Sequence, residues 1–545
     1  MLLTSEAVKN SATKLPVETA SVLARVVRFA PYILAAFFLL WSLRGVTGNE
    51  VHVPDAARHL MNGVFVHDMV RDGQLTHPLG YGKFYYSRLP ALSMPYHPPV
   101  FPLIESLFFF VFGVNLFAAR LAVALMVAVS VFLLYRLIVA THGSHLLATV
   151  SVLTFFSLSI SQYVATDVML EFPAMVFMLA ALYSLRELWK GYPLLRGLLF
   201  ALLAAIAVWT KQQTVFLGLV PFFYVIIARR WRLLADKTIW ISSALFGAGV
   251  LALLYISMKF NGAGLDQVSK GASIFSIFIR NVGIYAGYFQ EWFGLVPAIL
   301  LGLAFFAALF MRRSKEENPN DLYLAWVAAA LIFHLLLDAY DERYLIFLIP
   351  ALLVIGYSIL INLCRRILPP ARVWYVPGLV ALAWLIINLS STPVEFLHGP
   401  SEVAQSIIST KPDRVLYCGR TNGNFIFTTR TLDPQLHTVV LRGDKLPESI
   451  FTPEEFEDFA HRYGINYIVL EHTLKSPKDW TMPWDSLRLQ PTPSMAFERE
   501  IQLSGSDAEY NGELRIYRFT NPSITPESTL KLPIPKIKGD FEMNF

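Results

Sequence analysis

The sequence predicts a polytopic α-helical membrane protein with about 11 transmembrane helices, interfacial helices in a long first outer loop, and a small C-terminal extracytoplasmic α/β domain. The 545 residues are 55% hydrophobic and only 16% charged, whereas a soluble domain carries about 25% charged residues. The mean hydropathy is +0.49. Long apolar runs lie within 29–391, and 392–545 has the composition of an ordinary soluble chain. These observations exclude soluble globular, disordered and fibrous proteins.

Each predicted span is an apolar run close to the length that crosses a membrane, about 20 residues for roughly 30 Å of hydrocarbon. The first run lacks a small-residue cleavage site, so we interpret it as an uncleaved span and not as a signal peptide. In chain order the runs are 29–45, 117–139, 146–164, 168–186, 197–211, 213–228, 238–258, 289–311, 322–338, 344–364 and 373–391.

The run 99–114 is a separate case, because it is short, follows Pro98 and Pro99, and carries Glu105. The positive-inside rule decides how it is placed. With a cytoplasmic N-terminus, and with 99–114 lying in the outer leaflet as an interfacial helix, the basic ends of the spans all fall inside. A full span at 99–114 would place every one of them outside. These basic positions are Arg136, Arg186, Arg229, Arg312 and Arg365.

This topology divides the chain into three parts. Residues 1–28 form a cytoplasmic N-terminal segment, 29–391 a membrane-embedded domain with the outer loop 46–116, and 392–545 a domain outside the membrane. The last part contains β-strand patterns at 414–418 and 466–470 with a polar helical pattern between them, which indicates an α/β domain. We expect a multi-pass protein of the inner (plasma) membrane with this domain on the periplasmic or extracellular side.

Charge and cysteine content exclude two further classes. The net charge of +5 comes from 45 basic and 40 acidic residues, and the excess lies in short loops, so topology explains it and no nucleic-acid partner is predicted. Cys364 and Cys418 fall on opposite sides of the membrane in this topology, so no disulfide framework is expected.

Two acidic residues lie where spans meet the outer face. Asp55 and Arg58 open the first outer loop three residues apart, on one face of a helix that begins near Pro54. Asp55 is either a helix cap paired with Arg58 or a functional carboxylate. Asp167 lies between two apolar runs joined by almost no loop, where ionisable groups are usually functional, although a capping role is also open. Glu171 lies one turn deeper, as a neighbour or as a second acid.

Cations gather at the same face. Lys211 is the one basic residue in its outer turn, and it is either a snorkelling lysine or a functional cation. Arg343 and Arg120 either form local ion pairs or bind an anion. His97, in a segment stiffened by two prolines, is open to substrate orientation, metal binding or packing. The histidines of the loop lack paired spacing, so no cofactor is assigned and a divalent metal is left without support.

Carboxylates and cations at the outer mouth of an apolar bundle suit a lipid-borne anionic donor. A carboxylate can accept a proton from an acceptor hydroxyl, and cations can stabilise a departing phosphate. The spans would hold the lipid tail. Composition and topology do not identify a sugar.

The chain resembles the GT-C superfamily of membrane glycosyltransferases that use polyprenyl-phosphate-linked sugars, in particular the branch of protein O-mannosyltransferases and lipid A aminoarabinose transferases. The resemblance covers about 25–390 and rests on the order and common side of several short motifs. They are Asp55 with Arg58, His97-Pro-Pro99, Phe117-Ala-Ala-Arg-Leu121, Ala165-Thr-Asp167, Trp209-Thr-Lys211 and Arg343-Tyr-Leu-Ile-Phe-Leu-Ile-Pro350.

The resemblance implies an inverting hexosyl or pentosyl transfer from the lipid-linked donor to a lipid, glycan or protein acceptor at the outer face. It assigns Asp55 as the base and Asp167 as the second acid. Donor phosphate contacts would come from Arg58, Lys211, Arg343 and Arg120, and substrate orientation from Tyr96, His97, Glu171 and Tyr344. Two departures stand out: Ala56 follows Asp55 where many relatives have Glu, and Tyr96 replaces an acidic residue of the aminoarabinose branch.

Three other functions compete with this prediction. A transporter or flippase of a lipid-linked or anionic substrate would place charges near the bilayer midplane and repeat its halves. In this sequence the charges collect at one face and no internal repeat is visible. A structural or assembly protein leaves the one-sided cluster unexplained. An oligosaccharide ligase or polymerase with a diphosphate-linked donor is the nearest enzymatic alternative.

Overall fold

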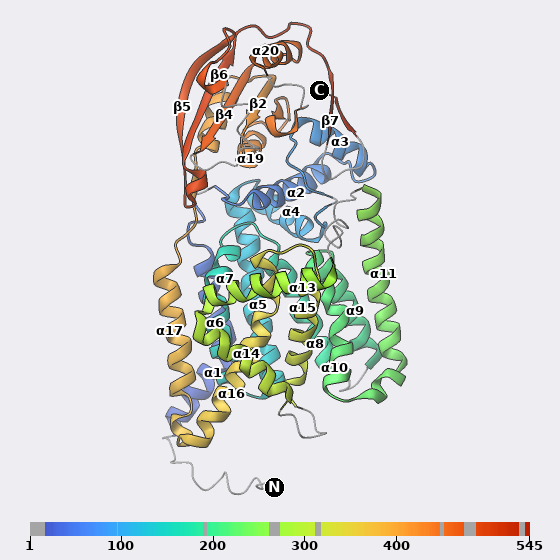
Figure 1. Cartoon of the computed structure of the whole chain (residues 1–545), viewed down its shortest axis with the longest axis vertical. Helices are drawn as coiled ribbons and strands as arrows, with labels where there is room; N and C mark the ends of the chain where they lie inside the picture. The colour runs from blue at the N-terminus through green and yellow to red at the C-terminus, as the bar shows by residue number, and fades with distance from the viewer. Residues whose placement is uncertain are drawn as a thin grey trace.

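The apolar runs form helices that pack side by side, and a sheet domain lies on one end of the bundle in the computed structural model of the protein (Figure 1). The structure describes residues 17–48, 50–94, 96–188, 193–260, 273–310, 318–446, 452–473, 487–533 and 540–544. Three parts of the predicted topology therefore lie wholly or partly outside the described residues: the N-terminal segment 1–28, the connection between the spans 238–258 and 289–311, and the basic span end at Arg312.

Helices of the bundle follow the predicted spans in the same order, except α13, most of which lies in the predicted connection before residue 289. The bundle consists of α1 (Val17–Ser42), α5 (Leu116–His142), α6 (His145–Ser157), α7 (Ser159–Ala165), α8 (Glu171–Arg186), α9 (Pro193–Val208), the 3-10 helix η1 (Gln212–Leu219), α10 (Val220–Ile227), α11 (Lys237–Phe260), α13 (Ile274–Phe293), α14 (Leu295–Phe310), α15 (Asp321–Leu335), the 3-10 helix η3 (Glu342–Phe347), α16 (Ile349–Ile367) and α17 (Tyr375–Ser391).

Length and composition qualify fewer helices as complete spans than the sequence predicts. Within the described ranges, three helices are long and apolar enough to cross a membrane: Leu116–His142, Lys237–Lys259 and Ile349–Ile367. The number rises to five if the bent pairs α6 with α7 (68°) and α13 with α14 (117°) each count as one span. Of the other predicted spans, 168–186 corresponds to α8 (Glu171–Arg186), and the rest correspond to shorter apolar helices. The number of spans therefore stays a prediction.

The predicted continuous span 289–311 is wrong at its start. Gly294 ends α13 with a φ of 74°, a backbone conformation that glycine adopts without strain, and α14 leaves at 117° to α13. In Figure 1, α13 lies across the bundle near its sheet-domain end, and α14 descends from it at an oblique angle. The predicted run is therefore sharply bent after its first residues.

The first outer loop folds into three helices, α2 (Pro54–Arg71), α3 (Pro78–Arg88) and α4 (Val100–Phe112). In Figure 1, α2 and α4 lie across the end of the bundle, beneath the sheet domain. On α4, Phe101 and Phe109 are buried, while Leu107 and Val111 are 62% and 73% exposed. One apolar face packed and one left open is the pattern expected of the predicted interfacial helix.

The C-terminal residues form the predicted α/β domain. Its sheet has the order β1-β5-β6-β4-β2-β3, with β2 parallel to both β3 and β4 and the other pairs antiparallel. The strands are β1 (Leu397–His398), β2 (Arg414–Cys418), β3 (Val439–Arg442), β4 (Tyr467–Thr473), β5 (Met495–Gly505) and β6 (Gly512–Phe519), with the separate pair β7 (Thr529–Pro533) and β8 (Asp540–Asn544). The helices are α18 (Pro400–Ile408), α19 (Asn422–Leu432) and α20 (Pro453–Arg462).

The sheet domain packs against α2 through a buried ion pair and a close helix contact. The guanidinium of Arg430 on α19 donates to both carboxylate oxygens of Asp68, at 2.6 and 2.5 Å, and the hydroxyl of Tyr85 donates to the same carboxylate at 2.9 Å. Both charged side chains are buried. Gly423 meets Ala57 so closely that a Cβ at position 423 would lie 2.5 Å from the Ala57 methyl group. Helix α2 is therefore part of a buried interface between the two domains.

Asp68→Asn should destabilise the folded protein by about 3–5 kcal/mol, because it leaves the buried Arg430 guanidinium without its charge partner. The thermal unfolding of the detergent-solubilised chain measures the effect. The control is Glu402→Gln, which removes a pair with Arg499 in which both side chains are 54% exposed. Such a pair contributes about 0–1 kcal/mol, so equal effects of the two substitutions would contradict the prediction.

Candidate functional site

The Asp55 pocket is a cavity of about 110 Å³ at the end of the bundle beneath α2 and α4. Segments that are far apart in the sequence build it: the first turns of α2, the strap before α4, the turn before α8, the start of η1, and η3. The lining residues are Asp55, His59, Tyr96, His97, Pro98, Leu170, Lys211, Gln212, Gln213, Arg343 and Tyr344. Six of the ten predicted site residues lie here, and a seventh, Glu171, contacts the lining residue Lys211.

Asp55 and Arg343 form the ion pair at the mouth of the pocket. An Arg343 Nη2 donates to Asp55 Oδ2 at 3.2 Å and to Asp341 Oδ2 at 2.6 Å. Burial raises the pKa of the Asp55 carboxyl, but the imidazolium that His59 forms in acid, the Arg343 guanidinium and other neighbours outweigh burial and lower that pKa well below its usual value. The Asp55 side chain keeps 39% of its surface exposed. It is therefore an ionised carboxylate that a ligand can reach.

Lys211 and Glu171 form a second, deeper pair. Lys211 Nζ lies 2.5 Å from Glu171 Oε1, and 5.9 Å from the ring centroid of Tyr344. Glu171 is fully buried and Lys211 nearly so. Lys211 is thus turned into the protein, and it does not extend towards solvent as a snorkelling lysine would.

Aromatic and imidazole rings close the side of the pocket nearest α4. The ring of His97 lies 4.5 Å from that of His59 and 4.8 Å from that of Tyr96, centroid to centroid. The Gln212 side chain donates to the Tyr96 carbonyl at 3.0 Å and so connects the segment before α4 to η1. Among the described residues no group of three or more His, Cys, Asp or Glu side chains could hold a metal ion. The described contacts of His97 are with rings, and its role in substrate orientation stays a prediction.

His59, Gln212 and Gln213 line the pocket although the sequence analysis did not single them out. His59 is fully enclosed, and burial lowers its pKa to about 4, so it is neutral near pH 7. The signal for it was available, because His59 follows Asp55 by four residues in a predicted helix and must share its face.

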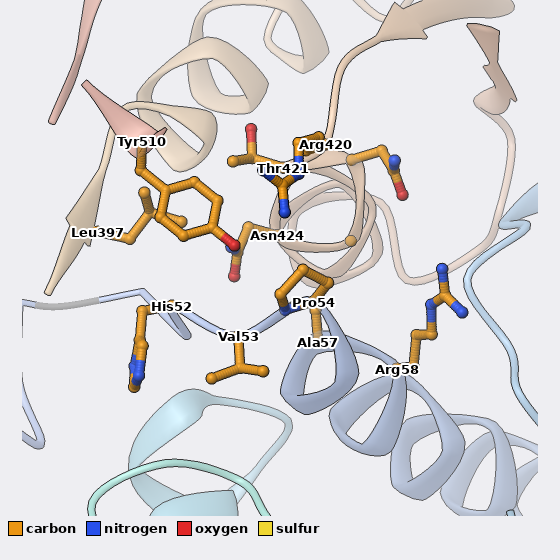
Figure 2. Close-up of a pocket in the computed structure, with 12 residues that line it drawn as sticks. His52, Val53, Pro54, Ala57, Arg58, Leu397, Arg420, Thr421, Asn424 and Tyr510 are labelled. Atoms are coloured by element: carbon orange, nitrogen blue, oxygen red, sulfur yellow. The ribbon is translucent and has the colours of Figure 1, made fainter. Parts of the chain in front are cut away.

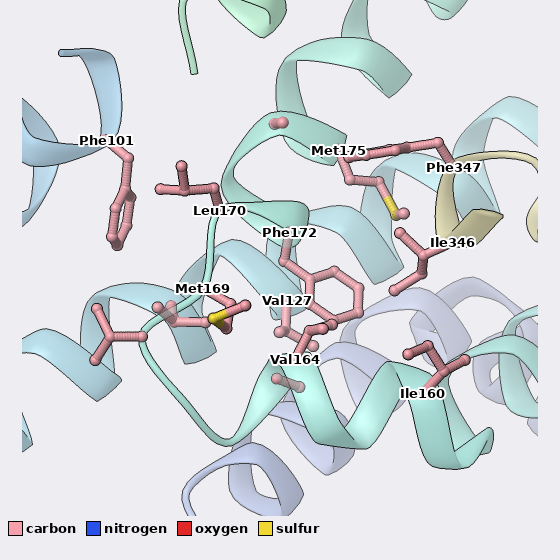
Figure 3. Packing of buried hydrophobic residues seen from close by; sticks show 14 of the residues in the cluster. Phe101, Val127, Ile160, Val164, Met169, Leu170, Phe172, Met175, Ile346 and Phe347 are labelled. Atoms are coloured by element: carbon pink, nitrogen blue, oxygen red, sulfur yellow. The ribbon is translucent and has the colours of Figure 1, made fainter. Parts of the chain in front are cut away.

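A hydrophobic cluster supports the floor of the pocket. Leu170, which lines the pocket, packs in this core with Phe172, Met175 and Phe347 (Figure 3). The cluster joins the α7–α8 turn, which contributes Leu170 to the pocket, to η3, which contributes Arg343 and Tyr344. Rigid packing here fixes the relative positions of Lys211, Arg343 and Asp55 because close-packed cores transmit small displacements.

Asp167 lies outside the Asp55 pocket. Its buried carboxylate accepts the backbone N–H groups of His52 at 3.2 Å, Val53 at 3.4 Å and Val168 at 2.9 Å, and contacts His52 Nδ1 at 3.0 Å. His52 and Val53 immediately precede α2. Through these contacts Asp167 holds the segment that leads into the helix carrying Asp55, and its role as a second acid stays a prediction.

Arg120 belongs to the same buried network. Its guanidinium donates to the carbonyls of Gly45 at 3.2 Å and Glu50 at 3.1 Å, and lies 3.9 Å from Asp167 Oδ1. These carbonyls belong to the connection between α1 and α2. The structure therefore does not bring Arg120 to the Asp55 pocket, where the resemblance placed it.

Arg58 also departs from its predicted place. It lines a different pocket, together with Pro54, Ala57 and residues of the sheet domain (Figure 2). Among the described residues no ion pair within 4 Å joins it to Asp55, whose partner is Arg343. The alternative of a local Asp55–Arg58 pair is therefore wrong, because Asp55 contacts Arg343 and Arg58 lines the other pocket.

The His52–Asp167 contact should make stability depend on pH. Burial lowers the pKa of His52, but Asp167 outweighs it and raises that pKa above its ordinary value of about 6.5. The charged pair stabilises the folded state fully at a pH below the ordinary pKa of histidine. This stabilisation is lost as the pH rises through the raised pKa of His52 in the folded protein. The melting temperature lost in His52→Gln should therefore be largest near about pH 5.5 and shrink by about pH 9.

The control for this series is His437→Gln, whose imidazole is 80% exposed. Its melting temperature should follow that of the wild type at every pH. A His52→Gln deficit that stays constant from acid to alkaline pH would contradict a charged pair with Asp167.

Comparison with known proteins connects this geometry to a family. Residues 96–257 match the family model described as dolichyl-phosphate-mannose-protein mannosyltransferase. No curated protein matches the chain. Two kinds of solved structure share its fold at low sequence identity, and each is also known in complex with a lipid phosphate.

The first is ArnT from Cupriavidus metallidurans bound to undecaprenyl phosphate, with a TM-score of 0.56, 15% identity, and coverage of 89% of this chain and 97% of that one. The second is the oligosaccharyltransferase of Archaeoglobus fulgidus, with a TM-score of 0.51, 10% identity, and coverage of 81% and 69%. The latter, AglB, is also known in complex with an inhibitory peptide and a dolichol-phosphate. The family match over residues 96–257 and the fold shared with these structures confirm the predicted GT-C-like fold.

Proposed function

We propose that the chain transfers a sugar from a polyprenyl-phosphate donor to a hydroxyl group of a lipid, glycan or protein acceptor, at the Asp55 pocket on the outer face of the plasma membrane. The observation that carries the proposal is an accessible carboxylate beside two cations, Arg343 and Lys211, at one end of an apolar bundle. The lipid phosphates held by ArnT and AglB support a donor of this class.

Asp55 acts as the base in this proposal. The acceptor oxygen bonds to the anomeric carbon on the face opposite the phosphate, the bond from that carbon to the phosphate oxygen breaks, and its electron pair leaves with polyprenyl phosphate. The hydroxyl proton passes to Asp55. Attack opposite the leaving group inverts the anomeric centre.

Arg343 links donor binding to the strength of this base. In the free protein its guanidinium is shared between Asp55 and Asp341. A donor phosphate at the same guanidinium would draw it away from Asp55. The pKa of Asp55 would then rise towards neutrality, where a general base works best. Lys211 supplies a second positive charge for the phosphate as negative charge develops on it.

The first test is Asp55→Asn in the purified full chain in nanodiscs. A panel of polyprenyl-phosphate sugars is offered and the release of polyprenyl phosphate is followed. The variant should lose roughly 10²–10⁴-fold in transfer rate, the usual contribution of a positioned base, while still binding undecaprenyl phosphate. Asp72→Asn, at the opposite end of α2, is the matched control and should transfer normally. Near-normal transfer by Asp55→Asn would show that Asp55 is not the general base.

The cation role of Lys211 is tested with its partner neutralised, because Lys211→Met alone would leave a buried, unpaired Glu171. The double variant Glu171→Gln/Lys211→Met should bind undecaprenyl phosphate about tenfold or more weakly, since a charge-assisted hydrogen bond is lost. Glu171→Gln alone frees the lysine and should bind at least as tightly as the wild type. Equal binding by the double variant and the wild type, measured by titration in nanodiscs, would exclude a phosphate contact for Lys211.

A further inference from the structure

A second polar cavity, the Arg58 pocket, lies between α2 and the sheet domain. Figure 2 shows it from close by, with the start of α2 on one wall and the start of α19 on the other. The N–H of Thr421 at the start of α19 already donates to the buried Glu471 carboxylate at 3.0 Å, and α2 begins at Pro54, which has no N–H. The positive charge of the pocket therefore comes from its arginine side chains. The polar side chains that line the pocket include Arg58, Arg420, Thr421, Asn422, Asn424 and Tyr510.

Arg58 brings a positive charge that its surroundings do not neutralise. Its half-buried guanidinium makes no hydrogen bond or ion pair with the part of the chain that the structure describes. The acids nearest to it are held by other cations: Asp444 contacts Arg442 at 2.6 Å and Lys445 at 3.2 Å, and Asp55 contacts Arg343. Burial, followed by the charge of Arg442, lowers the pKa of Arg58. A partly desolvated guanidinium with all its donors free favours an anionic ligand.

Neutral polar groups and a second cation surround the same space. Arg420 contacts Glu509 at 2.8 Å and lies 5.5 Å from the ring centroid of Tyr510. Asn424 donates to the Val51 carbonyl at 2.8 Å, which fixes its side chain across the domain interface. Figure 2 shows the Tyr510 hydroxyl and the Asn424 side chain facing the gap between the two helices. Amide, hydroxyl and aromatic groups beside a cation match the mixture of polar edges and apolar faces of a sugar.

We propose that the Arg58 pocket binds an anionic saccharide group of the acceptor, a sugar bearing a phosphate or a carboxylate. This inference rests on the proposed function and adds the substrate class. One pocket holds Asp55 and His59 and the other holds Pro54, Ala57 and Arg58, so the first turns of α2 separate them. The apolar bundle that would take a polyprenyl tail does not line the Arg58 pocket, which is bordered by the sheet domain. The acceptor is therefore the substrate that this pocket suits.

Ligand binding in the Arg58 pocket can be measured without relying on catalysis. Phenylglyoxal modifies exposed guanidinium groups, and mass spectrometry of the full-length chain in nanodiscs follows the modification of Arg58. The exposed Arg499 is the internal reference. The probes are a hexose phosphate, inorganic phosphate and a neutral hexose. A saturable protection of Arg58, and not of Arg499, by the hexose phosphate at lower concentration than by the other two probes is the expected result.

Affinity for the hexose phosphate should fall at least about tenfold in Arg58→Gln and less in Arg58→Lys, and it should be unchanged in Arg499→Gln. Titration of each variant measures it, and Arg58→Gln should melt with the wild type because no described contact is lost. Wild-type affinity in Arg58→Gln, or no protection by either phosphate, overturns the proposal. Protection by inorganic phosphate equal to that by hexose phosphate overturns its saccharide part.

The same chain separates this proposal from the proposed function. Loss of polyprenyl-phosphate release from every donor, with protection of Arg58 intact, would reject glycosyl transfer and leave an anionic saccharide site. Transfer that persists with no protection at Arg58 would reject the pocket alone.

Discussion

Everything at the candidate site depends on how α2 is held. The helix is fixed at its start by the buried carboxylate of Asp167, which accepts two backbone N–H groups ahead of it, and near its end by the buried pair of Asp68 and Arg430. The first restraint comes from the bundle and the second from the sheet domain. Because a helix is stiff between two such points, these two contacts also hold Asp55 opposite Arg343.

The charges of the site are arranged in pairs for a physical reason. Removing an ion from water costs several kcal/mol even after relaxation, so Glu171 is tolerated in full burial only with Lys211 against it. Asp55 is different, because it stays partly exposed and shares Arg343 with Asp341. A shared partner can be exchanged for an incoming phosphate at lower cost than an exclusive one. The deeper pair provides a fixed field, and the outer pair is the one that a substrate can rearrange.

The local parts of this architecture could be predicted from the sequence. Apolar runs fix which segments are helical, and the strand pattern at 414–418 coincides with β2 because both depend on short-range order. Asp55, Lys211 and Arg343 could be gathered because the topology places them on one face. The break at Gly294 and the neighbour His59 were also readable from local signals, a glycine within an apolar run and a spacing of four residues.

The partners of buried charges could not be predicted in the same way. Asp167 lies 115 residues from His52, and Arg430 lies 362 residues from Asp68, so no local pattern records either contact. The surroundings of Arg58 could not be predicted either. Its place on α2 was predictable, but the wall that it faces is made by the start of α19, and only the tertiary fold brings that helix to it.

The distance between Asp68 and Arg430 along the chain also sets an order of events during biosynthesis. A ribosome adds about 5–20 residues each second, so the acid emerges about 20–70 s before its basic partner. Throughout that interval the bundle can insert while α2 lacks the restraint at its far end. The sheet domain, made last, supplies the contact that holds the far end of the helix carrying Asp55. The site is therefore complete only after residues 392–545 have been made and folded, and a nascent chain stalled before that point holds an unfinished site.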